Sequence, residues 1–283
     1  MKKTIRLDKM LGNLGYGTRS GIKALVRQGA VTVNGAAAKD PGMQIDPEKD
    51  EVVLDGERIA YRDTVYVLLH KPAGYVSATE DNRDRTVLEL LDEETNVFSP
   101  FPVGRLDKVT EGLLLLTNDG KLSHELLSPR KHVPKTYWAL VAGEVGQEDV
   151  ERFAGGVALD DGYVTLPAEL KVLAVARAGE SLRHPEMAQA ADRTSRVPGL
   201  RGAELAEARR QGLALSWIEL TIHEGKYHQV KRMFQAVEKE VVYLRRVAMG
   251  PLGLDPALAP GEWRELAEEE LAALRDYRKG QTE

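Results

Sequence analysis

The 283-residue chain contains no cysteine, which excludes disulfides, thiolate catalysis, iron–sulfur clusters and every cysteine-based zinc site. It also lacks any stretch near the roughly 18 apolar residues that a membrane helix needs. The start, MKKTIRLDKM, carries lysines but no apolar run long enough for a signal peptide. We therefore expect a cytoplasmic protein without a membrane segment, since a reducing compartment suits a cysteine-free chain.

An excess of positive charge is also missing, because the formal net charge is −5 and the sequence pI is about 5.8. Taken whole, this acidity argues weakly against a nucleic-acid partner. The charge is segregated, however: residues 1–39 carry a net +7 and residues 40–68 a net −5, while 100–137 and 223–250 carry +2 and +3. A basic segment can bind polyanions locally, because contacts with phosphates are local.

The basic N-terminal segment has the pattern of a small αβ unit. Apolar residues recur at helical spacing from Ile5 to Leu14, and Thr18 can cap a second helix. Two short strands follow, around Val31–Val33 and 51–54, and Asn34-Gly35 is a strong hairpin signal. Five basic side chains recur at turn-like spacings that can place them on one helical face, namely Arg6, Lys9, Arg19, Lys23 and Arg27.

The stretch RLDKMLGNLGYGTRSGIKALVRQGAVTVNG resembles the RNA-binding module named after small-subunit ribosomal protein S4. The resemblance covers roughly the first 60 residues. It departs mildly from the usual pattern at Thr18-Arg19-Ser20. The resemblance implies that the five basic residues contact structured RNA, but it implies no particular chemistry, since this module occurs in proteins of different function.

A second informative stretch runs from Pro102 to Gly120, PVGRLDKVTEGLLLLTNDG. Gly104 and Gly112 bracket a loop in which Asp107 stands between basic residues, so we expect this carboxylate to stay ionised. An apolar strand and an Asn-Asp-Gly turn follow. On these residues alone, an aspartate in such a loop is far more often a turn former or a member of a surface ion pair than a catalytic group. No phosphate-binding G-x-x-x-x-G-K-[ST] pattern is present.

Two later segments complete a recognisable set. Lys135-Thr136-Tyr137-Trp138 opens a predicted strand, and EGKYHQVKRMF, beginning at Glu224, combines a glycine turn with a basic patch and a helix start. Together with GRLDxxTEGLLLLTNDG and the N-terminal module, these stretches resemble the RsuA-type family of pseudouridine synthases. The resemblance extends from Arg6 to about Leu266.

The resemblance implies three catalytic residues. Asp107 matches the aspartate that attacks the target uridine, either at the base, at the sugar carbon or by assisting removal of a ribose proton. Tyr137 matches the tyrosine that stacks on the uracil. Lys231 stands where many of these enzymes carry an arginine paired with the aspartate, and a lysine lacks the bidentate fork of arginine. No metal or other cofactor is implied.

Three further residues are expected to bind the substrate. Arg232, beside Lys231, competes for the role of partner to the aspartate, and the sequence does not separate the two. Leu244 matches the apolar residue beneath the base, and Arg105 is expected to fill the base stack or steer a phosphate once the uridine is extruded.

The expected fold class is α+β. Residues 1–60 are assigned to the RNA-binding domain, 61–64 to a linker, 65–266 to a catalytic domain with a mixed, mostly antiparallel central sheet, and 267–283 to a C-terminal helix and tail. Residues 176–212 replace what is usually a short turn in the family. We predict a mobile surface insertion there, with a helix only at 202–210.

The function that the resemblance implies is isomerisation of uridine to pseudouridine in ribosomal RNA, by a monomer acting on ribosomal RNA or the pre-ribosomal small subunit. The motifs favour the small-subunit 16S branch, at a uridine-516-type site, over the large-subunit 23S branches. Two other hypotheses stay open. The chain is a binding-only ribosome-assembly factor, or a hydrolytic glycosidase that pairs Asp107 with Glu111 or Asp119.

Overall fold

The computed structural model describes residues 4–47 and 49–280, which divide into two compact units. The first unit comprises the chain up to Val65 together with Leu91–Pro100, and the second comprises Tyr66–Leu90 with the chain from Phe101 onward. Among the described residues, no helix is both long and apolar enough to cross a membrane.

The first unit is the small αβ unit that the N-terminal pattern predicts. Its sheet has the order β3-β2-β5-β6, β1 pairs with β4, and its core is formed by apolar residues from both helices and the strands. Asn34 and Asp55 adopt positive φ angles in the turns that join β2 to β3 and β5 to β6. The elements are β1 (Ile5–Arg6), α1 (Leu7–Asn13), α2 (Arg19–Arg27), β2 (Val31–Val33), β3 (Ala36–Ala37), β4 (Gln44–Ile45), β5 (Val52–Leu54), β6 (Glu57–Ile59) and α3 (Glu93–Asn96).

One detail of the predicted first helix is wrong. Ile5, assigned to the helix by its spacing, lies in β1, where it pairs with Ile45, and the helix begins at Leu7. The two-residue strand and the helix are contiguous, so the apolar spacing runs through the boundary unchanged. Thr18 caps α2 as predicted, since its hydroxyl accepts a hydrogen bond from the backbone N–H of Gly21.

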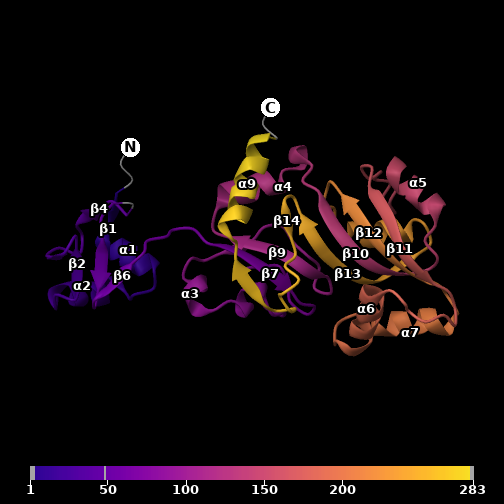
Figure 1. Ribbon diagram of the computed structural model, residues 1–283, viewed down its shortest axis with the longest axis horizontal. Coiled ribbons are helices and arrows are strands. Elements are labelled where there is room, and N and C mark those ends of the chain that lie inside the picture. The colour runs from indigo at the N-terminus through magenta and orange to yellow at the C-terminus, as the bar shows by residue number, and fades with distance from the viewer. Residues whose placement is uncertain (1–3, 48, 281–283) are drawn as a thin grey trace. The chain divides into compact units, whose positions relative to one another are not determined.

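The second unit is built on one mixed sheet with the strand order β11-β12-β10-β13-β9-β7-β15. In Figure 1 this order runs from β11 on the right to β7 on the left. Every pairing in it is antiparallel except that of β13 with β9, which confirms the expected α+β class with a mostly antiparallel central sheet. Its strands are β7 (Tyr66–Lys71), β8 (Phe101–Pro102), β9 (Glu111–Thr117), β10 (Lys135–Ala142), β11 (Glu169–Ala176), β12 (Leu215–Ile222), β13 (Glu240–Met249), β14 (Leu252–Gly253) and β15 (Trp263–Glu265).

Helices cover this sheet and its edges. Asp119 caps α4 by accepting a hydrogen bond from the backbone N–H of Leu122, so the predicted Asn-Asp-Gly turn is also a helix start. The helices are α4 (Gly120–Leu127), α5 (Gln147–Gly155), α6 (Pro185–Arg196), α7 (Gly202–Arg210), α8 (Gln229–Gln235) and α9 (Glu268–Gly280), with 3₁₀ turns at Val87–Leu90 and Pro129–Lys131.

The segment 176–212 corrects the expectation of an irregular insertion. It contains α6 as well as the expected α7, and Figure 1 shows the two helices side by side below β10, β12 and β13. Met187, Ala190 and Ala191 of α6 are buried in one cluster with Trp217 of the sheet. The apolar face of α6 consists largely of alanine, and such small side chains produce a weak hydrophobic period. The sequence therefore gives little signal for this helix.

Candidate active site

A pocket of about 390 Å³ opens in the second unit, which is within the size range of small-molecule sites. It is lined by the loop before β9, by strands β10, β12 and β13, and by the segment that enters α8. Five of the six catalytic and substrate-binding residues expected from the sequence line it, namely Arg105, Asp107, Tyr137, Lys231 and Leu244.

An ion pair lies in this pocket. The Lys231 amino group donates a hydrogen bond to Oδ2 of Asp107 at 2.5 Å, and Nε2 of His228 lies 3.5 Å from the other carboxylate oxygen. The side chain of Lys231 is 14% exposed and that of Asp107 is 27% exposed. The carboxylate is thus paired with a cation yet still open to the pocket.

Arg232 lies elsewhere. Its guanidinium binds Asp160 and Asp161, both of which lie in the segment between α5 and β11. These contacts raise the pKa of Arg232, since the hydrogen bonds that its guanidinium donates to Asp161 and then to Asp160 stabilise its charged form. The structure thus brings Lys231, and not Arg232, to Asp107.

The backbone of the loop that carries Asp107 is tied to the chain segment after β7. The Ser77 hydroxyl donates to the carbonyl of Leu106 at 3.0 Å and accepts from its N–H at 3.1 Å. The Lys71 amino group, which is fully buried, donates to the carbonyls of Lys108 and Thr110 at 3.3 and 2.9 Å. Burial lowers the pKa of Lys71 to about 8. These contacts fix the loop from both ends.

Neighbouring strands supply the walls of the pocket. Lys135 and Tyr137 are two residues apart on β10 and therefore point to the same face of the sheet. Leu244 of β13 pairs with Ala139 of β10 and is nearly buried. Arg105 lines the pocket from the loop before β9, and its side chain is exposed.

The carboxylates that a glycosidase would pair with Asp107 do not line this pocket. Glu111 is fully buried, and its carboxylate binds Arg193 and Tyr243. Asp119 caps α4 and accepts a hydrogen bond from the Tyr66 hydroxyl. Neither carboxylate stands where it could act with Asp107 on one substrate.

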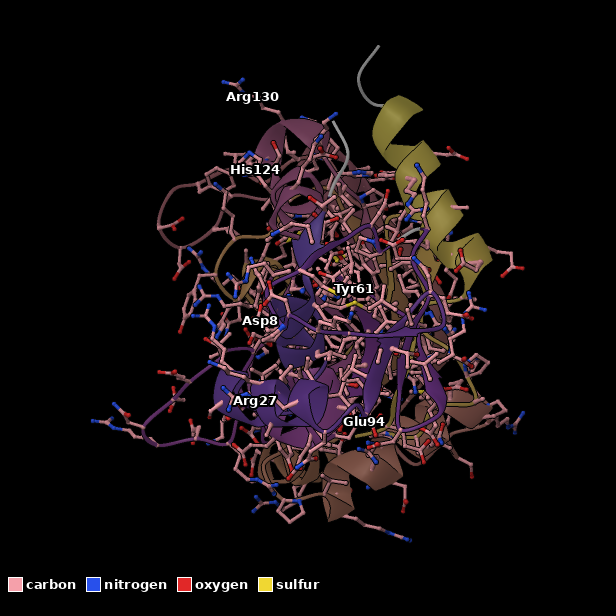
Figure 2. All side chains as sticks on the ribbon, turned by 90° about the vertical axis from the view of Figure 1, so that its left-hand side faces the viewer. Asp8, Arg27, Tyr61, Glu94, His124 and Arg130 are labelled. Carbon is pink, nitrogen blue, oxygen red and sulfur yellow. The ribbon has the colours of Figure 1, made fainter. Side chains whose placement is uncertain are left out.

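The candidate RNA-binding residues lie in the first unit. Arg19, Lys23 and Arg27 are spaced by four residues along α2, so they share one exposed face, and Arg27 is labelled in Figure 2. Lys9 is exposed on α1. Arg6 is also exposed but lies in β1, where it forms a bidentate ion pair with Asp8.

Two side chains that the sequence did not single out also belong to the pocket. His228 stands at the start of α8 with φ of 48°, in the left-handed region, which non-glycine residues avoid unless their surroundings hold them. Lys135 lines the wall beside Tyr137. Both residues lie in the motifs quoted above. The basic and aromatic character of those motifs is the sequence signal that could have indicated them.

Comparison with known proteins defines the class. Residues 65–236 match the family described as RNA pseudouridylate synthase, and residues 5–52 match the S4 domain. The first match covers more than half of the chain. The protein therefore belongs to the RNA pseudouridylate synthases and is an isomerase.

Its relatives refine this assignment to the RsuA type. The chain is 36% identical to ribosomal small subunit pseudouridine synthase A of Escherichia coli (strain K12), over 95% of this chain and 100% of that protein. It is 46% identical to the RNA pseudouridine synthase YtzG of Bacillus subtilis (strain 168), over 96% and 99%. A crystal structure of a pseudouridylate synthase matches 95% of this chain and 99% of that chain with 32% identity and a TM-score of 0.57.

Proposed function

We propose that this synthase converts one uridine of small-subunit 16S ribosomal RNA to pseudouridine, with Asp107 as the catalytic residue. The observation that carries the proposal is the pairing of the Asp107 carboxylate with Lys231 at 2.5 Å inside a pocket that Tyr137 also lines. The choice of RNA is supported by the relatives named ribosomal small subunit pseudouridine synthase A.

The reaction exchanges one bond of the nucleotide for another. The N1–C1′ bond breaks, the uracil turns, C5 joins C1′, the proton on C5 leaves, and N1 gains a proton. The Lys231 ammonium holds the Asp107 carboxylate in place to act as a nucleophile or base. Tyr137 offers a ring for stacking and a hydroxyl near the proton to be removed, while Leu244 packs beneath the base.

The target uridine must leave its stack to enter the pocket, at an unstacking cost of a few kcal/mol. We assign to Arg105 a contact with the extruded nucleotide, because its side chain is exposed and lines the pocket on the same loop as Asp107. Arg232, paired with Asp160 and Asp161, is assigned to ordering the pocket wall rather than to the aspartate. The first 60 or so residues would supply affinity through phosphate contacts.

Release of tritium from 16S RNA labelled at uracil C5 tests the proposal. The wild-type protein should release label while the RNA chain stays intact, and Asp107→Asn should release none yet still bind RNA. The matched control is Asp192→Asn, which removes an exposed carboxylate of α6 and should keep full activity.

Other outcomes separate the alternatives. Binding without release would indicate a binding-only factor, and abasic sites would indicate hydrolysis. An active Asp107→Asn variant would end the assignment of the aspartate. Carbodiimide-dependent primer extension on ribosomal RNA from a deletion strain locates the uridine, and a missing signal in 23S rather than 16S RNA would refute the choice of substrate.

A further inference from the structure

A buried carboxylate stands directly after the loop that carries Asp107. Glu111 is the first residue of β9, four residues after Asp107, and its side chain is 0% exposed. Its carboxylate accepts hydrogen bonds from the Tyr243 hydroxyl at 2.9 Å and from the backbone N–H of Ala73 at 3.2 Å. A carboxylate in such a place needs a cation, because an uncompensated buried charge is strongly unfavourable.

The cation comes from the inserted helix α6. Nε and Nη2 of Arg193 donate to the two oxygens of Glu111 at 2.6 and 2.7 Å, which is a bidentate pair between residues 82 positions apart. A second ion pair, of reversed polarity, joins α6 to the neighbouring strand β13, since Nη2 of Arg245 in β13 lies 2.6 Å from Glu186 of α6. Glu186 and Arg193 are seven residues apart and share one face of the helix. The sequence of α6 is thus matched to this face of the sheet.

This face lies opposite the pocket. Tyr243, which contacts Glu111, precedes Leu244, which lines the pocket, and adjacent strand residues point to opposite faces. Arg193 therefore cannot act on the substrate directly. Arg193 contacts Glu111, at the end of the loop that carries Asp107, from the face of the sheet opposite the pocket.

The consequence for the loop follows from its connections. Glu111 binds Ala73, in the same segment in which Lys71 and Ser77 hold the backbone of residues 106–110. A shift of Glu111 would therefore move the loop. We propose that Arg193 is a positioning residue of this synthase: by neutralising Glu111, it holds the loop so that Asp107 stays beside Lys231. The proposal rests on the catalytic role proposed above for Asp107.

The electrostatics agree with this geometry. Burial alone would raise the pKa of Glu111, but the hydrogen bonds and charge of the Arg193 guanidinium, together with the hydrogen bonds from Tyr243 and the Ala73 N–H, more than offset it, so the pKa lies below its usual value. Other titratable or charged groups near this site are Tyr243, His70, Lys71, Arg245 and Glu186, the last of which pairs with Arg245. The Lys71 ammonium is already hydrogen-bonded to loop carbonyls.

Arg193→Met leaves Glu111 without its guanidinium and raises the pKa of that carboxyl. At low pH the Glu111 carboxyl of this variant is neutral, and it can stay in its buried position without a cation. As the pH rises through the raised pKa, the charge appears and Glu111 moves toward solvent with the loop. The variant should therefore lose activity with rising pH where the wild type does not, and Arg193→Met/Glu111→Gln should lack this loss.

Single-turnover tritium release and RNA affinity, measured on the full-length protein, test the proposal. We expect the rate for Arg193→Met to fall about 100-fold at neutral pH with unchanged RNA affinity, the size expected for a misplaced catalytic group. The double variant should recover most of the rate, because an amide at position 111 needs no cation. Arg196→Met is the matched control, since it removes an exposed arginine of the same helix, and it should behave as wild type.

Arg193→Lys provides a second arm in case the methionine variant does not fold at the assay temperature, as thermal melting will show. Lysine keeps the charge but not the fork, so we expect an intermediate rate and wild-type affinity. The proposal is overturned if the position 193 variants keep the rate of Arg196→Met, or if they lose affinity at an unchanged rate. Asp107→Asn is assayed in parallel: activity in that variant refutes the proposed function, whereas a dead Asp107→Asn beside fully active position 193 variants refutes only the role of Arg193.

Discussion

Lys135 should give RNA binding a dependence on pH in a range where few side chains titrate. This lysine lines the pocket beside Tyr137, and its amino group donates to the carbonyl of Val133 at 3.0 Å. Burial, followed by the charge of Arg246, lowers its pKa from the usual 10.5 to about 8. An ammonium in this position is suited to an oxygen of the bound nucleotide.

The size of the effect follows from that pKa. RNA binding favours the protonated lysine, so affinity is complete well below pH 8 and declines as the pH rises through that value. The protonated fraction falls nearly tenfold between pH 7 and pH 9, so affinity should fall by about tenfold, or about 1.4 kcal/mol. One hydrogen bond to a charged group typically contributes about 1.5–3 kcal/mol. Loss of the bond made by the Lys135 ammonium is therefore large enough to account for this decline.

Fluorescence anisotropy with a labelled RNA fragment, at constant ionic strength, measures this decline. The Asp107→Asn background prevents turnover during the titration. Lys135→Arg is the matched control, because arginine stays charged throughout, and its affinity should be nearly flat over the same range. The comparison also removes the titration of the RNA and of Lys71, whose pKa is also about 8. If RNA affinity declines equally with pH whether position 135 holds lysine or arginine, the role of Lys135 is refuted.

The remaining predictions concern stability and the N-terminal unit. The pKa of Lys71 is about 8 in the folded protein and near 10.5 when unfolded, so between these values the folded state holds fewer protons and stability rises with pH, by up to about 3 kcal/mol; chemical denaturation of Lys71→Met should lack this rise. Gly112→Ala should prevent stable folding, as thermal melting will show, because a Cβ there would stand 2.2 Å from the Arg246 carbonyl oxygen, whereas Gly120→Ala meets no atom within 4 Å. Glutamine at four exposed bases should weaken RNA binding and flatten its salt dependence, and unchanged binding would exclude this surface, the four being Lys9, Arg19, Lys23 and Arg27.

Several elements of both units could be predicted because their signals are local. Leu113–Leu116 is an apolar run, and Asn34-Gly35 fixes a hairpin by backbone preference alone. The meeting of Asp107 with Lys231, 124 residues later, is not local. It was anticipated only because whole motifs, in their order, resembled a family in which these positions meet.

The contact between Arg193 and Glu111 had neither kind of signal. The segment 176–212 departs from the family pattern, so no resemblance applied to it, and its arginines look like any solvated charge run. Glu111, read alone, is a polar residue at the start of a strand. Only the packing of α6 on β10 and β13 shows that its charge is buried and where its cation comes from.

The choice between Lys231 and Arg232 shows what decides such cases. On α8, the buried residues Val230, Met233 and Phe234 define the core-facing side. Adjacent helix positions differ by about 100°, so Lys231 and Arg232 must leave the helix in different directions, and only one can face Asp107. The helix periodicity thus excludes a shared role, but the direction of each depends on the neighbouring loops. Asp160 and Asp161, which bind Arg232, belong to a turn closed by the bridge between Ala158 and Val164, and nothing in the motif itself indicates that turn.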